Sequence, residues 1–152
     1  MKKLYIFLTC AVMLSACGNK GGVSEDSLQG TYSIDISDAG SLFESEFKIP
    51  TAMVSSLLTS ADLTVEFKDS KATVDAGTMA SMLIKTATSG KYSLPVSLDF
   101  KIENDSILYL KQEGQDFKEV GVVSKVGDNY DKLIYKPKYK SVNATLELNR
   151  QK

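Results

Sequence analysis

The sequence contains no histidine and no tryptophan, and its 152 residues include only two cysteines, Cys10 and Cys17. Histidine is the commonest general base at neutral pH and the commonest metal ligand, so many catalytic and metal sites lack their usual residue. The charge is nearly balanced, with 18 basic and 19 acidic residues. Nucleic-acid-binding proteins usually carry a strongly basic patch, and this composition gives no reason to expect nucleic acid as a partner.

The remaining polar residues form no motif that is typical of an enzyme. No serine stands in a G-x-S-x-G sequence, and no glycine-rich phosphate-binding motif occurs. General acid–base catalysis needs carboxyl groups in environments that separate their pKa values. The carboxylate pairs of this chain fall in expected turns or at polar positions, where water should keep both groups ionised: Asp35 and Asp38, Glu44 and Glu46, Glu103 and Asp105, Asp128 and Asp131. We therefore expect no enzymatic activity and no cofactor.

The segment 127–131 (GDNYD) places several side-chain oxygens close together in the sequence. Calcium prefers oxygen ligands, but an EF-hand loop would need about twelve residues with a glutamate at its end. A hairpin turn that uses Asp and Asn in left-handed backbone conformations explains the same residues. The sequence therefore predicts no metal site.

Met1 is followed by Lys2 and Lys3, an apolar run over residues 4–14 and the two small residues Ser15 and Ala16. This order is typical of a secretory signal peptide. A helix over the apolar run would be only about 16 Å long, whereas the hydrocarbon core of a membrane is about 30 Å thick. We therefore expect a signal peptide and not a transmembrane helix.

The residues Leu14-Ser15-Ala16-Cys17 resemble the lipobox of bacterial lipoproteins. The resemblance implies that residues 1–16 are removed, that the Cys17 sulfur receives a diacylglycerol, and that the new amino group is acylated, for example with palmitate. A single acyl chain holds a protein to a membrane only marginally, whereas two or three chains make a durable anchor. Cys17 is thus the predicted lipid-attachment residue, and membrane lipid is its partner. The alternative is a secreted protein that is cut nearby, with Cys17 as an incidental thiol.

The same resemblance implies a place in the bacterial cell envelope. Gly18, and not an aspartate, follows Cys17, which favours the outer membrane over inner-membrane retention. Lys20 comes before the first acidic residue, Glu25, which favours the periplasmic face over the cell surface. Cys10 would leave with the signal peptide, so no disulfide could form within the chain.

After cleavage the chain would have 16 basic and 19 acidic residues, a net charge of −3. Residues 17–27 are polar and rich in glycine, and we expect them to form a flexible tether. Residues 28–150 have the length of one domain with a sizeable core.

Apolar residues alternate with polar ones along most of residues 28–150, which is the pattern of strands with one buried face. Eight strands are predicted, within residues 28–37, 62–68, 72–76, 91–102, 107–112, 117–126, 132–136 and 141–149. Pro95 cannot donate a hydrogen bond to a neighbouring strand, so it should mark a sheet edge or a bulge. Helical spacing predicts a helix over residues 50–61 and a shorter one at 41–47. Residues 77–90 suit either a helix or a strand, and we favour a short helix.

Sequential strands joined by short turns favour an antiparallel up-and-down β-barrel, with a two-sheet β-sandwich as the alternative. Gly30-Thr31-Tyr32 resembles the G-x-W opening of lipocalins, with tyrosine in place of tryptophan. This resemblance implies a lipocalin-like (calycin-like) barrel. Eight-stranded barrels either hold one small ligand or are filled by their own side chains.

Two functions follow from these patterns. The first is a membrane-anchored binding module for a small apolar or amphipathic ligand, and the second is a structural lipoprotein that contacts an envelope protein partner. The basic segment 132–140 (KLIYKPKYK) could contact anionic headgroups, glycans or a protein. It could equally be an edge strand that lysines and Pro137 protect from unwanted pairing.

Overall fold

The computed structural model describes residues 22–36, 62–138 and 144–152. Eight antiparallel strands form a closed barrel in which each strand pairs with the next and the last pairs with the first. The strands are β1 (Gly30–Asp35), β2 (Thr64–Lys68), β3 (Lys71–Asp75), β4 (Val96–Glu103), β5 (Ile107–Lys111), β6 (Lys118–Lys125), β7 (Lys132–Pro137) and β8 (Leu146–Arg150). The predicted up-and-down barrel is confirmed, and the β-sandwich alternative is wrong.

The alternating sequence pattern explains how the barrel closes. Tyr32 of β1, Phe100 of β4 and Leu133 of β7 are each almost fully buried, and polar neighbours on the same strands face outward. The final pairing joins β1 to β8, with Ile34 opposite Leu148. Closure leaves no strand with an unpaired edge, which removes a common route to aggregation.

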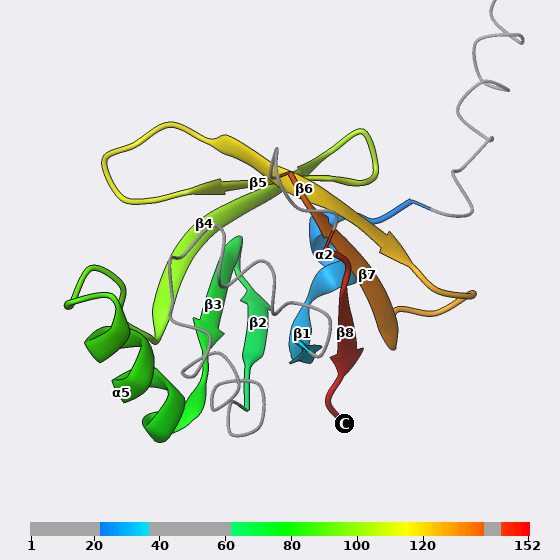
Figure 1. Cartoon of the computed structure of the whole chain (residues 1–152). Helices are drawn as coiled ribbons and strands as arrows, with labels where there is room; N and C mark the ends of the chain where they lie inside the picture. Colours follow the sequence, from blue (N-terminus) through cyan, green and yellow to red (C-terminus); the bar gives the residue numbers. More distant parts are fainter. Residues whose placement is uncertain (1–21, 37–61, 139–143) are drawn as a thin grey trace, which may run out of the picture.

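Two helices lie within the described residues: α2 (Glu25–Leu28) and α5 (Gly77–Ala87). The helix favoured for residues 77–90 is therefore confirmed, and it lies outside the barrel wall beside β3 and β4 (Figure 1). The helices predicted at 41–47 and 50–61 lie outside the described residues, as does Cys17.

The tether predicted for residues 17–27 is wrong for the part that the structure describes, 22–27. Ser24 and Ser27 form a reciprocal capping box that starts α2. Val23, just before this short helix, and Leu28, its last residue, are 1% and 0% exposed. The polar composition suggested a flexible segment, but the buried side chains of Val23 and Leu28 hold it against the barrel, while Ser24 and Asp26 stay exposed.

Two further predictions about strands need correction. The strand predicted from residue 91 begins at Val96, directly after Pro95, and Tyr92 is 41% exposed. The chain uses this stretch to return from α5, with Ser89 and Gly90 in left-handed backbone conformations. The suggestion that β7 is a protected edge is also wrong, because β7 pairs with both β6 and β8.

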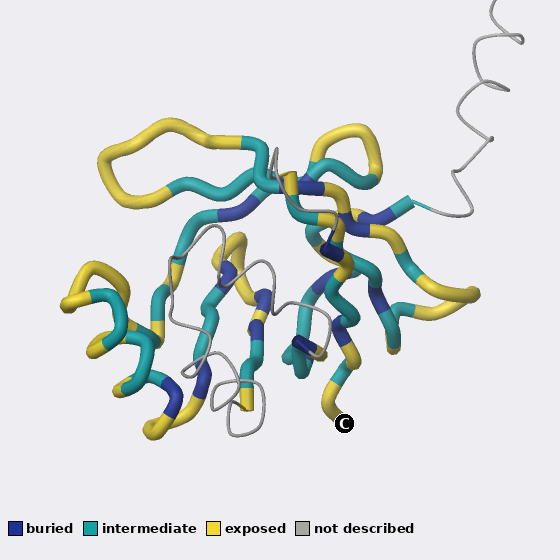
Figure 2. The backbone as a smooth tube through the Cα atoms, in the orientation of Figure 1, coloured by how far each residue is buried: buried dark blue, intermediate teal, exposed yellow. Residues whose placement is uncertain are grey.

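The two ends of the barrel differ in their connections. At one end, which we call the closed end, the tight turns 69–70 and 104–106 and the loop 126–131 lie beside α2 and the end of β8. The other end, which we call the open end, carries α5 and the exposed loop 112–117. Figure 2 shows that the buried residues lie mainly along the strands and around α2, while the connections at both ends are exposed.

Candidate ligand site inside the barrel

The half of the barrel interior next to the closed end is filled by the protein's own side chains. Val23, just before α2, and Leu28, its last residue, join the buried cluster that contains Tyr32, Phe67 and Phe100. The Phe67 ring contacts Phe100 at a centroid distance of 5.0 Å and Tyr32 at 6.0 Å, both in edge-to-face geometry. Such aromatic pairs add about 0.5–1.5 kcal/mol beyond the area that they bury. This end of the barrel is therefore a packed core and not a binding site.

Arg150, the last residue of β8, forms hydrogen bonds that link α2 and the residue after it to the barrel. Its Nη2 atom donates hydrogen bonds to the Gln29 carbonyl at 2.9 Å, the Ser27 carbonyl at 3.2 Å and the Tyr32 hydroxyl at 2.8 Å. The guanidinium carbon lies 5.2 Å from the centroid of the Tyr32 ring, in cation–π geometry. Burial raises the pKa of the Tyr32 hydroxyl above its ordinary value of 10.0, although Arg150 acts in the opposite direction.

The interior toward the open end contains an apolar cavity of about 120 Å³. Ile34, Val74, Leu110 and Leu146 lie near the strand ends at this side of the cavity. The complete lining is Ile34, Val65, Phe67, Ala72, Val74, Leu108, Leu110, Val123, Leu133, Tyr135, Leu146 and Leu148. Every strand except β4 contributes at least one of these residues, so the cavity is a product of barrel closure.

The lining provides no charged group and only one polar one. The Tyr135 hydroxyl donates a hydrogen bond to the Val120 carbonyl at 2.8 Å, so this proton is not available to a ligand in the cavity. Cavities of about 150 Å³ with aliphatic and aromatic walls stay dry and bind benzene or xenon, whereas sites for drug-sized ligands are about 300–1,000 Å³. The cavity thus fits one small apolar group, such as a ring or the end of an alkyl chain.

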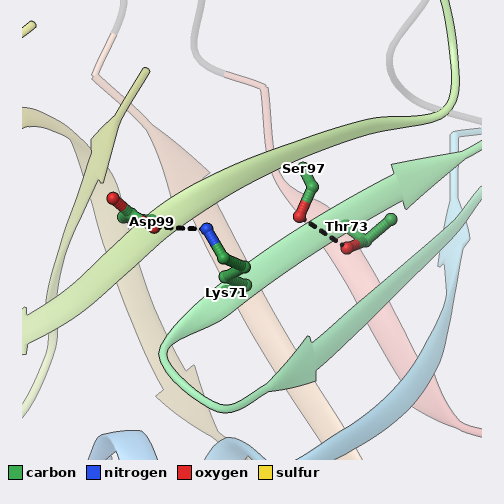
Figure 3. Close-up of polar contacts among 4 residues, drawn as sticks. All are labelled: Lys71, Thr73, Ser97 and Asp99. Carbon is green, nitrogen blue, oxygen red and sulfur yellow. Dashed lines mark hydrogen bonds and ion pairs between the residues drawn. The ribbon is translucent and has the colours of Figure 1, made fainter. Parts of the chain in front are cut away.

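A polar groove on the outer face of the barrel, of about 350 Å³, is lined by Lys71, Ser97, Asp99, Lys111, Glu113 and Gly114. Its main contacts join cross-strand partners of β3 and β4: Lys71 Nζ to Asp99 Oδ1 at 2.8 Å, and Thr73 Oγ1 to Ser97 Oγ at 3.0 Å (Figure 3). The hydrogen bond from Lys71 lowers the pKa of the Asp99 carboxyl and raises that of Lys71. These pairs hold the two strands in register, and both charges are solvated.

The carboxylates that the sequence analysis considered and the structure describes are all exposed: Asp35, Glu103, Asp105, Asp128 and Asp131. Glu103 forms an ion pair with Lys101, and this contact lowers the pKa of Glu103. Asp131 accepts a hydrogen bond from the Asn129 amide at 2.9 Å inside the β6–β7 loop. Among the residues that the structure describes, no group of three or more His, Cys, Asp or Glu could hold a metal ion. Asp38, Glu44 and Glu46 lie outside that part of the chain.

The basic segment 132–140 is partly neutralised by glutamates of adjacent strands. Lys132 forms an ion pair with Glu147 at 2.7 Å, and Lys138 forms one with Glu119 at 2.6 Å. Residues 139 and 140 lie outside the described part of the chain. Lys132 of β7 and Lys138, directly after β7, therefore form ion pairs with glutamates of the neighbouring strands β8 and β6.

Two parts of this interior were missed by sequence reasoning. Arg150 is a lone arginine near the end of the sequence, and its contact with Tyr32 spans 118 residues, so only barrel closure brings the two together. The cavity has no sequence signal at all, because filled and partly empty barrels have the same alternating pattern.

Comparisons of this chain with protein-family models, with curated proteins and with solved structures found no match. None of the described helices has the length and apolar character that a membrane-spanning helix needs.

Proposed function

We propose that this protein is a lipid-anchored protein of the bacterial envelope whose barrel binds a small apolar group. The anchor is proposed from the lipobox-like residues that end at Cys17. The binding role rests on one observation, the apolar cavity of about 120 Å³ in an otherwise filled barrel.

The cavity narrows the class of ligand. Its size admits about one ring or the last few methylene groups of an alkyl chain, because a benzene-binding cavity is only slightly larger. Each buried methylene contributes about 0.8 kcal/mol, so a chain end held by several methylenes would bind weakly to moderately. The lining has no cation or anion, so a charged head would stay outside the barrel.

The second candidate is a structural lipoprotein with a barrel filled by its own side chains. The packed closed end supports this reading, and the apolar cavity near the open end supports the first. The two functions differ in one measurable property, the uptake of a ligand into the cavity.

Ligand uptake can be measured with decanoate, on the domain without its acyl chains. We expect native mass spectrometry to detect a one-to-one complex. We also expect methyl NMR signals of Val74 and Leu110 to shift while those of Val23 and Leu28 stay in place. The substitution Ala72→Leu adds bulk to the cavity wall and should abolish both effects, whereas Thr73→Val, on the outer face of the same strand, should preserve them. Absence of uptake by the unmodified domain would favour the structural role.

The anchor can be tested separately in the host cell. The variant Cys17→Ala removes the sulfur that the lipid would occupy. We expect the natural chain to incorporate an alkyne-labelled palmitate and to fractionate with membranes, and the variant to do neither. A labelled variant would disprove the assignment of Cys17.

A further inference from the structure

We propose that the barrel stands on its membrane with the closed end toward the lipid and the open end toward the aqueous compartment. The side of the cavity lined by Ile34, Val74, Leu110 and Leu146 would then face the aqueous compartment and not the bilayer that holds the anchor. This inference rests on the anchoring part of the proposed function.

The chain enters the barrel at a fixed point on the closed end. Val23 donates its backbone N–H to the Asp105 carbonyl at 2.7 Å, and the Tyr130 hydroxyl donates to the Gly22 carbonyl at 3.0 Å. Asp105 belongs to the β4–β5 turn and Tyr130 to the β6–β7 loop, and both lie at the closed end (Figure 1). Val23 is 1% exposed, so the entry point cannot move without opening the core.

The covalent distance from the anchor to this entry point is short. Cys17 and Gly22 are five residues apart, so the chain between them spans at most about 18 Å when fully extended. Strand β6 has eight residues. At about 3.3 Å per residue and a tilt of about 40°, it spans about 20 Å along the barrel axis. The linker therefore cannot run along the barrel wall and still reach the membrane from the open end.

The surface depression beside the entry point is acidic, so this part of the closed end has no attraction of its own for anionic lipid. Glu25, Asp26 and Asp105 surround Val23 and line one shallow depression there. Anionic headgroups would repel these carboxylates, so the acyl chains and not the protein surface would hold the domain. The short linker, and not adhesion, would set which end is near the membrane.

The arrangement also assigns a direction to the exposed apolar residues of the open end. Met79 and Met82 of α5 are 71% and 65% exposed, and Phe117, the last residue of the 112–117 loop, is 37% exposed. On an upright barrel these side chains face water on the far side from the anchor.

The test uses the acylated protein in vesicles of phosphatidylethanolamine and phosphatidylglycerol. Because lipid occupies Cys17, a single new cysteine can carry a fluorophore at the closed end (Asp128→Cys), on the wall (Val122→Cys) or at the open end (Glu113→Cys). We expect quenching by headgroup nitroxides to be strongest at position 128, weaker at 122 and weakest at 113. Strongest quenching at 113 or at 122 would overturn the proposal, as would equal quenching at all three positions.

A second variant tests the role of linker length directly. Insertion of about ten Gly and Ser residues after Lys20 adds up to about 35 Å, which exceeds the height of the barrel. We expect the difference in quenching between positions 128 and 113 to shrink in this variant. An unchanged difference would show that something other than the linker sets the orientation and would contradict the mechanism.

These outcomes are separable from a failure of the proposed function. A protein that does not float with vesicles lacks the anchor, and decanoate uptake is measured without any membrane. Only a protein that floats with the wrong end toward the lipid contradicts the orientation itself.

Discussion

The two halves of the barrel interior are built from the same strands but are packed differently. At the closed end, Leu28, Tyr32 and Phe100 are 0–1% exposed and belong to the buried core cluster. Toward the open end, aliphatic side chains such as Ile34, Val74 and Leu110 surround a cavity. One alternating pattern thus gives a stable core and a candidate binding site in one barrel, and the volumes of the inward side chains set where each lies.

The largest expected effect comes from deleting a ring in the filled half. We expect Phe100→Ala to lower the free energy of unfolding by about 3–5 kcal/mol, because a fully packed site cannot collapse around the missing ring. The matched variant Leu110→Ala enlarges a space that already exists and should cost about 2 kcal/mol. Urea denaturation followed by circular dichroism measures both. Equal losses would mean that the two halves are packed alike.

A smaller effect is expected from the arginine that closes the filled half. Arg150→Met keeps the aliphatic stem but removes three hydrogen bonds, leaving the Tyr32 hydroxyl and two carbonyls without this donor. We expect a loss of about 2–3 kcal/mol, since hydrogen bonds to charged groups are the stronger ones. Lys132→Met breaks only an exposed ion pair and should cost less than about 1 kcal/mol. Urea denaturation at neutral pH measures the free energy of unfolding of both variants. Similar losses would contradict the stabilising role of the Arg150 hydrogen bonds.

The smallest expected effect is a decline of the free energy of unfolding at high pH. Burial raises the pKa of Tyr32, so the neutral hydroxyl is favoured in the folded barrel. The resulting stabilisation is complete below about pH 10 and is lost as pH rises through the folded-state pKa. Tyr32→Phe removes this group, so the high-pH decline of its unfolding free energy should be shallower than that of the natural chain.

Lysines also lose charge in that range, so the comparison needs a second tyrosine variant. Tyr92 comes before β4 in the chain and is 41% exposed. We expect Tyr92→Phe to keep most of the decline. A decline of the same steepness in Tyr32→Phe and the natural chain would show that Tyr32 ionises as freely as in the unfolded chain.

The strands were predictable because their signal is local. Tyr32 and Ile34, or Leu98 and Phe100, stand two residues apart, and a strand needs no distant information to put them on one face. The start of β4 was misplaced because Tyr92 and Leu94 continue the same alternation, while the return from α5 and Pro95 prevent pairing there. Residues 22–27 were taken for a tether because their polarity is visible in the sequence, while the pocket that receives Val23 is formed by other strands.

The sequence by itself determined the strand pattern, favoured a barrel over a two-sheet β-sandwich and carries the prediction of a lipid anchor at Cys17. These depend on residue types at fixed short spacings, which each segment carries alone. The tertiary structure decided that α2 plugs one end, that Arg150 meets Tyr32, and that a cavity remains at the other end. Packing volume and long-range register exist only when all eight strands are closed around one axis, so no single segment could specify them.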